Sequence, residues 1–67
     1  MSIDRDLTLY EIANKERRYW QFYREQMHRG KDTLECRRIA HAKLAPELAG
    51  LSEKNKQRIL TAIELSE

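Results

Sequence analysis

Apolar residues recur at helical spacing in three stretches of the chain, and no stretch alternates with the period of two that marks a β-strand. In the first stretch they fall on one broad face at about 100° per residue: Leu9, Ile12, Ala13, Tyr19, Trp20, Tyr23 and Met27. The second and third stretches have narrower faces: Cys36, Ile39, Ala40 and Leu44, then Ile59, Leu60 and Ile63. The pattern predicts an all-α, three-helix single domain over residues 1–67, with a flexible start over residues 1–7.

Local signals set the limits of the long first helix. Thr8 and Glu11 have the spacing of a capping box, in which each side chain accepts a hydrogen bond from the other's backbone N–H. Gly30 is a natural stop, because glycine readily adopts the left-handed conformation that ends many helices. The first helix is therefore expected to run from Leu9 to near Arg29.

The two shorter helices have their own start and stop signals. The pair Asp32-Thr33 supplies a cap for the second helix. Pro46 is expected to end or kink that helix near residues 44–45, because proline has no N–H to donate and clashes with the preceding turn. Ser52 is expected to cap a third helix that reaches about residue 65.

All five aromatic residues lie on the first predicted helix, and they cannot share one face. Trp20 is near the centre of the apolar face and should be mostly buried, whereas Phe22 lies off that face and should belong to an interface. Glu16 interrupts the face, either by reaching out to solvent or an arginine, or as a polar specificity point in a helix–helix seam. Because Trp, Tyr and Arg are enriched at interaction hot spots, we expect a protein interface at Tyr10, Arg18, Tyr19, Phe22, Tyr23 and Gln26.

The size of the chain favours self-association. A domain of 67 residues has a small core, and Cys36 is the only cysteine, so no disulfide can form within one chain. Oligomerisation is another common way to stabilise so small a domain. A homodimer that shares the long helices is therefore expected.

The charge distribution leaves nucleic acid as an alternative partner. The net charge is only +2, but residues 15–43 carry nine basic and four acidic groups, net +5. Basic side chains that contact phosphates give salt-sensitive binding. The candidate contacts, of which the last three are expected to be exposed, are Arg17, Arg24, Arg29, Lys31, Arg37, Arg38 and His41.

The string Leu48-Ala49-Gly50-Leu51-Ser52, with apolar residues at 59 and 60, resembles the turn of a helix-turn-helix motif over residues 44–60. That resemblance implies a DNA-reading helix after the turn. The sequence departs from the motif at Pro46, where a small residue is usual, and at Lys56, near a usual apolar position.

Catalytic and metal-binding patterns are not found. Cys36 and His41 fall about 140° apart around a helix, so they do not converge locally. His28 and His41 lie on different predicted helices, and two glycines do not make a phosphate-binding loop. We therefore expect no enzyme activity, no cofactor and no metal.

One unpaired cysteine and the lack of a long apolar run predict a cytoplasmic protein without a membrane span.

The sequence therefore predicts a small non-enzymatic regulatory binding protein, an inhibitor or adaptor, that acts through a helical protein–protein interface. The alternative is a small nucleic-acid-binding regulator that uses the basic segment 15–43 and the helix-turn-helix-like region 44–60.

Overall fold

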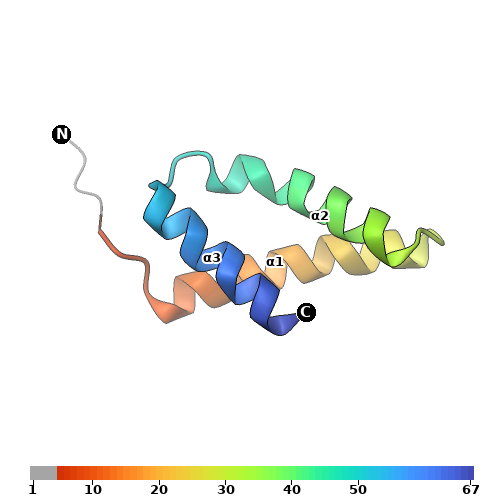
Figure 1. Cartoon of the computed structure of the whole chain (residues 1–67), viewed down its shortest axis with the longest axis horizontal. Helices are drawn as coiled ribbons and strands as arrows, with labels where there is room; N and C mark the ends of the chain where they lie inside the picture. Colours follow the sequence, from red (N-terminus) through yellow and green to blue (C-terminus); the bar gives the residue numbers. More distant parts are fainter. Residues whose placement is uncertain (1–4) are drawn as a thin grey trace.

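The computed structural model describes residues 5–67, which form three helices: α1 (Leu9–His28), α2 (Thr33–Leu48) and α3 (Glu53–Ser66) (Figure 1). The helix α2 runs antiparallel to α1, and α3 returns in the direction of α1. Both α2 and α3 pack against α1. Over the described residues there is no strand, so the predicted all-α, three-helix fold is confirmed.

Capping side chains begin all three helices as predicted. The Thr8 hydroxyl accepts a hydrogen bond from the Glu11 N–H at 3.1 Å, and the Glu11 carboxylate accepts one from the Thr8 N–H at 3.0 Å. The Asp32 carboxylate caps α2 by accepting from the N–H three residues on, at 2.8 Å. The Ser52 hydroxyl does the same for α3, at 3.2 Å. Each contact satisfies a backbone donor that the first helical turn leaves without a partner.

The helix α1 ends in a Schellman motif. Gly30 has a φ of 83°, which an L-residue with a Cβ adopts only at a cost. Its N–H donates to the Met27 carbonyl at 3.0 Å, and the Lys31 N–H donates to the Gln26 carbonyl at 3.2 Å. These two bonds are the pair that defines the motif, so the predicted stop at Gly30 is confirmed.

Pro46 was expected to end or kink α2 near residues 44–45, and the first of these two alternatives is wrong. The helix continues through Pro46 to Leu48. Pro46 is exposed and lies in the last turn, so the missing N–H removes a single backbone hydrogen bond. One more turn also places Leu48 directly after Leu44 on the buried face, and this apolar burial favours continuing the helix.

The core lies between α1 and the two helices that pack against it. Its buried apolar members are Ile12, Tyr19, Cys36, Ala40, Leu44, Leu48, Ile59 and Ile63. On α1 the buried positions recur every seven residues, at Ile12, Tyr19 and Gln26. This narrow strip is the most deeply buried part of α1.

The buried strip is rotated from the predicted apolar face of α1. Leu9, Ala13 and Met27 are exposed. Phe22, which was expected off the core, packs against it on the side of α2. Trp20, which was expected to be mostly buried, packs against the core but keeps part of its surface exposed. The reason is tertiary: α2 covers one flank of α1 along its length, whereas α3 covers the other flank only in part.

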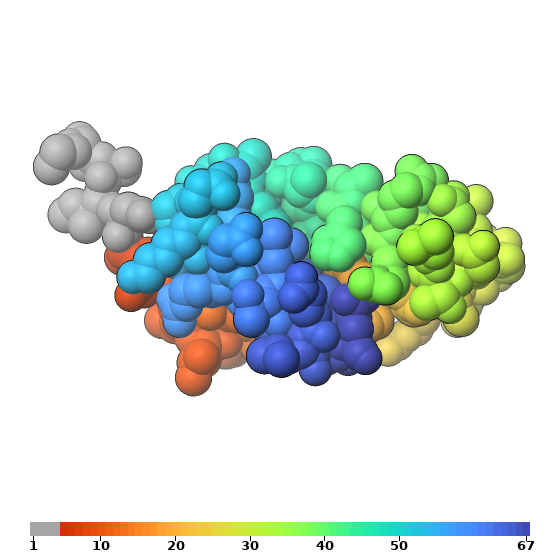
Figure 2. All heavy atoms as spheres, in the orientation of Figure 1, coloured from red at the N-terminus to blue at the C-terminus, as the bar shows by residue number. Residues whose placement is uncertain are grey.

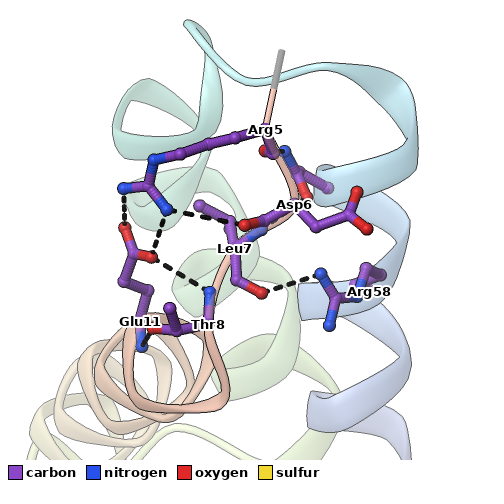
Figure 3. A network of polar contacts seen from close by, with 7 residues as sticks. Arg5, Asp6, Leu7, Thr8, Glu11 and Arg58 are labelled. Atoms are coloured by element: carbon purple, nitrogen blue, oxygen red, sulfur yellow. Dashed lines mark hydrogen bonds and ion pairs between the residues drawn. The ribbon is translucent and has the colours of Figure 1, made fainter.

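The segment before α1 is fixed to α3 by side chains (Figure 3). The Asn55 amide accepts from the Leu7 N–H at 3.1 Å and donates to the Arg5 carbonyl at 2.9 Å. Arg58 donates to the Leu7 carbonyl at 2.8 Å. Residues 5–7 belong to the start that was expected to be flexible, and their backbone is paired here with Asn55, which is only 2% exposed. Residues 1–4, also predicted to be flexible, lie outside the described residues.

Candidate functional site

The second half of α1 lacks a cover from α3. The last turn of α3 lies beside the middle of α1, while α1 and α2 continue alone to the far end of the molecule (Figure 1; Figure 2). Just beyond the end of α3 is a cleft of about 670 Å³. Its lining residues all belong to α1: Trp20, Tyr23, Arg24, Met27 and His28.

The floor of this aromatic cleft is built from rings that support one another. The Trp20 ring meets the Tyr23 ring edge to face at 5.0 Å and the Tyr19 ring at 4.9 Å. Edge-to-face pairs at such distances add to the energy gained by burying the rings. The Trp20 indole N–H also donates to the Ser66 hydroxyl at 3.1 Å. The indole is thus held by the Tyr19 and Tyr23 rings of α1 and by Ser66 at the end of α3.

The side chains of Arg24 and His28 give the aromatic cleft a basic rim. Across residues 5–67, neither forms an ion pair within 4.0 Å of a carboxylate, and the same holds for Arg17, Arg29 and Lys31. Because the Arg24 guanidinium has no carboxylate partner within the described chain, its charge is available to a negatively charged ligand.

The other basic residues of segment 15–43 do have carboxylate partners. The Glu47 carboxylate forms ion pairs with Arg18 at 2.8 Å and with Lys15 at 3.3 Å. The hydrogen bond from Arg18 is the main reason why the pKa of the Glu47 carboxyl lies below its usual value. The remaining pairs are Arg37 with Glu67, Arg38 with Glu35 and Lys43 with Glu25. Much of the predicted basic block is therefore balanced by acidic side chains.

A buried tyrosine and an ion pair lie beside the aromatic cleft. Tyr19 is 0% exposed, and its hydroxyl donates to the Glu67 carboxylate at 3.1 Å. Arg37 approaches the same carboxylate at 2.7 Å. Burial, followed by the contact with Glu67, raises the pKa of Tyr19 to about 12. The His41 ring lies 4.8 Å from the Tyr19 ring.

The six residues of the predicted protein interface do not form one surface. Tyr19 and Gln26 are buried in the core, so they do not lie on the surface that the prediction required. Tyr10 is 75% exposed near the start of α1. Tyr23 lines the aromatic cleft.

Phe22 and Arg18 instead belong to the contact between α1 and α2. The guanidinium of Arg18 lies 5.0 Å from the centre of the Phe22 ring, and the Lys43 ammonium lies 5.8 Å from it. Such cation–π contacts cover the ring. The ring is thereby partly buried within the fold, and Arg18 extends beyond it to Glu47.

The predicted nucleic-acid contacts are spread over α1, α2 and the loop between them. Arg37 and Arg38 are exposed, as expected. His41 is not: it is partly buried and packs on Tyr19, so that part of the prediction is wrong. The other four residues, at positions 17, 24, 29 and 31, are exposed.

In the helix-turn-helix-like region, α2 ends at Leu48 and α3 begins at Glu53. Two basic side chains on α3 are already engaged by the segment before α1. Lys54 pairs with Asp6 at 3.0 Å, and Arg58 donates to the Leu7 carbonyl. These contacts compete with any phosphate contact from the same side chains.

Sequence reasoning missed a second cleft, of about 330 Å³, between the start of α1 and the end of α3. This leucine cleft is lined by Leu9, Ile12, Arg58, Thr61, Ala62 and Leu65. Leu9 is 80% exposed and Leu65 is 84% exposed. The signal in the sequence was a pair of leucines at helix ends, a pattern that has no meaning until the two ends are known to be adjacent.

Among the described residues, no group of three or more His, Cys, Asp or Glu side chains could hold a metal ion. Cys36 is buried, with its sulfur 3.5 Å from the Lys31 carbonyl oxygen.

Of the helices within residues 5–67, none combines the length and apolar character needed to cross a membrane. Comparison of the chain with protein-family models, curated proteins and solved structures finds no match.

Proposed function

We propose that this chain is a small non-enzymatic binding protein whose aromatic cleft receives a large apolar side chain from an acidic segment of a partner protein. The observation that carries the proposal is the combination in one cleft of Trp20, Tyr23 and Met27 with the basic rim of Arg24 and His28. Aromatic and Met-rich clefts suit apolar anchors. A regulator of this kind acts by occupying its partner.

The charge of the rim determines the chemistry of the partner. Complementary potentials favour association and oppose wrong partners. Because the rim side chains have no carboxylate partner within residues 5–67, a segment with Asp or Glu next to its apolar anchor gains ion pairs without breaking existing ones. The length of α1 beyond the end of α3 suits an amphipathic helix laid along it.

Selection from a random peptide library on the immobilised protein tests this proposal. Trp20 is the only tryptophan in the chain, so its fluorescence reports binding at the aromatic cleft. Selected peptides should combine acidic residues with Leu, Phe or Trp. Arg24→Glu should weaken them about tenfold or more, a loss of roughly 1.4 kcal/mol.

Arg17→Glu is the matched control, because it makes the same charge change two turns away on α1, at an exposed residue that does not line the cleft. Equal losses in both variants would mean that only the overall charge attracts the peptides, and the proposed site would be wrong. A selection without an acidic, apolar consensus would contradict the function itself.

Nucleic acid is tested in the same series with labelled duplex and single-stranded oligonucleotides. Phosphate binding should weaken steeply as the salt concentration rises, whereas an apolar anchor in an aromatic cleft depends far less on salt. Tight, salt-sensitive oligonucleotide binding without peptide binding would replace our proposal with the nucleic-acid alternative.

We also propose that the chain self-associates through the leucine cleft. In a twofold contact the same surface patch of both copies is used, so a patch that carries charges of one sign opposes the contact. The basic rim therefore makes the aromatic cleft a poor self-contact. The lining of the leucine cleft is uncharged except for Arg58, which is engaged by the Leu7 carbonyl.

Sedimentation across a concentration series tests self-association. Leu65→Lys should shift the protein toward monomer without unfolding it, because the side chain is largely exposed. Leu34→Lys, at a 74% exposed leucine on α2, is the control that should leave association unchanged. A wild-type monomer at every concentration would refute this second proposal.

A further inference from the structure

The side chain of Glu67 occupies a position that resembles a bound ligand. It extends from the end of α3 into the space between α1 and α2. One carboxylate oxygen lies 3.1 Å from the Tyr19 hydroxyl and 2.7 Å from Nε of Arg37. The other accepts from the Arg37 guanidinium at 3.4 Å. The carboxylate is thus held by a neutral donor and a cation, both on other helices.

These two donors are suited to carboxylates in general. A guanidinium presents two N–H groups in a geometry that matches both carboxylate oxygens. Tyr19 is buried, and burial raises its pKa, so its hydroxyl keeps its proton and remains a donor at neutral pH. The fold fixes Tyr19 within the core, so this donor stays in place whichever carboxylate accepts from it.

The carboxylate position adjoins the aromatic cleft. The Tyr19 ring contacts the Trp20 ring and lies 6.2 Å from the Tyr23 ring, and both of these residues line the cleft. The residue before Glu67, Ser66, accepts the hydrogen bond from the Trp20 indole. A peptide in the cleft therefore meets Ser66 and Glu67 at one end of the cleft.

We propose that Arg37 and Tyr19 form a carboxylate-binding site, that Glu67 fills it within the chain, and that a carboxylate of an acidic partner segment replaces Glu67 when the partner enters the aromatic cleft. The partner exchange rests on the proposed function, whereas the carboxylate site does not. Exchange is feasible because Arg37 is half exposed, and a solvent-screened ion pair is weak enough to be replaced by an equivalent one.

The first experiment uses sodium propionate as the probe and Glu67→Ala to empty the site. In this variant, NMR signals of the Arg37 side chain and of the Trp20 indole should shift with propionate and saturate. They should not do so with propionamide, or with sodium chloride at the same ionic strength. Wild type, in which Glu67 fills the site, and the double variant Glu67→Ala with Arg37→Gln should show no saturating shift.

The second experiment uses the acidic peptides selected on the wild-type protein. Glu67→Ala removes the internal competitor, so it should bind them about three- to fivefold more tightly, the size expected for one partly exposed ion pair. Glu64→Ala is the matched control, because it removes the same charge from an exposed position one turn earlier on α3. It should change the affinity by less than about half that factor.

The outcomes separate the two ideas. A propionate response that does not saturate, or that persists without Arg37, overturns the carboxylate site. Peptides that bind Glu67→Ala and Glu64→Ala equally overturn the exchange but leave the proposed function standing. If no acidic peptide is selected, the proposed function fails and the exchange fails with it, while the propionate result still decides the carboxylate site.

Discussion

Replacing Asn55 by alanine should release the segment before α1. The Asn55 side chain joins this segment to α3, because it pairs with the Leu7 N–H and the Arg5 carbonyl at once. Alanine removes both hydrogen bonds and favours the helix, so any loss of stability reflects the lost amide and not a poorer helix former.

The expected loss follows from three contributions. Each of the two hydrogen bonds contributes roughly 1 kcal/mol net. Leu7 packs against the core and would lose part of that packing, worth about 1 kcal/mol or less. The conformational freedom regained by the released residues offsets some of this loss. We expect Asn55→Ala to lower the free energy of unfolding by about 1.5–3 kcal/mol, a large share of the roughly 3–10 kcal/mol typical of this chain length.

Urea unfolding followed by circular dichroism measures this loss, with Gln57→Ala as the control. Gln57 is an exposed amide on the same helix, so its removal should change stability by no more than about 0.5 kcal/mol. Hydrogen exchange gives a second measurement: the Leu7 amide should be protected in wild type and should lose protection in Asn55→Ala. A variant as stable as the control, or a Leu7 amide whose exchange is unchanged, would refute the role given to Asn55.

Three further predictions follow from backbone conformation and from the shifted pKa values. Gly30→Ala should destabilise the protein by about 1 kcal/mol in thermal unfolding, because only the positive φ opposes a Cβ there. The control is Gly50→Ala, at a glycine whose φ is not positive, and it should be neutral or stabilising. Equal effects of the two substitutions would contradict this account. The hydrogen bond from Arg5 is the main cause that lowers the pKa of Glu11 from 4.5 to about 2. The stability advantage of wild type over Glu11→Gln should therefore be complete above pH 4.5 and disappear as the pH falls toward 2. A stability difference that does not depend on pH would contradict this pKa shift. Because the pKa of Tyr19 is raised from 10.0 to about 12, wild type should lose stability relative to Tyr19→Phe as the pH rises through that interval, and parallel curves in urea unfolding would disprove the shift.

The number and limits of the helices could be predicted because they depend on local signals. The capping box at Thr8, the stop at Gly30 and the cap at Ser52 each act within one turn of their own helix, so the sequence contains all the information required. Pro46 shows the limit of such reasoning. Its local preference predicted an end to α2, but the burial of Leu48 is a tertiary effect, and it favours one more turn.

The rotation of α1 and the surfaces could not be predicted for a related reason. Periodicity identifies an apolar face, but the partners of that helix decide which part of the face is covered. Met27 belongs to the predicted face but is 46% exposed, whereas Gln26 is polar and only 2% exposed. Asn55 was overlooked because a polar residue in the first turn of a helix is ordinary, and only the fold brings residues 5–7 to it.

Four basic side chains of α1 form two pairs with different surroundings. On the side of α2, Lys15 and Arg18 are joined to Glu47, and these contacts help to hold the two helices together. Beyond the end of α3, Arg24 and His28 border aromatic rings and have no carboxylate partner within residues 5–67. Within residues 5–67, the fold therefore leaves beside α1 an apolar, basic surface of the kind that we propose an acidic helix from another protein completes.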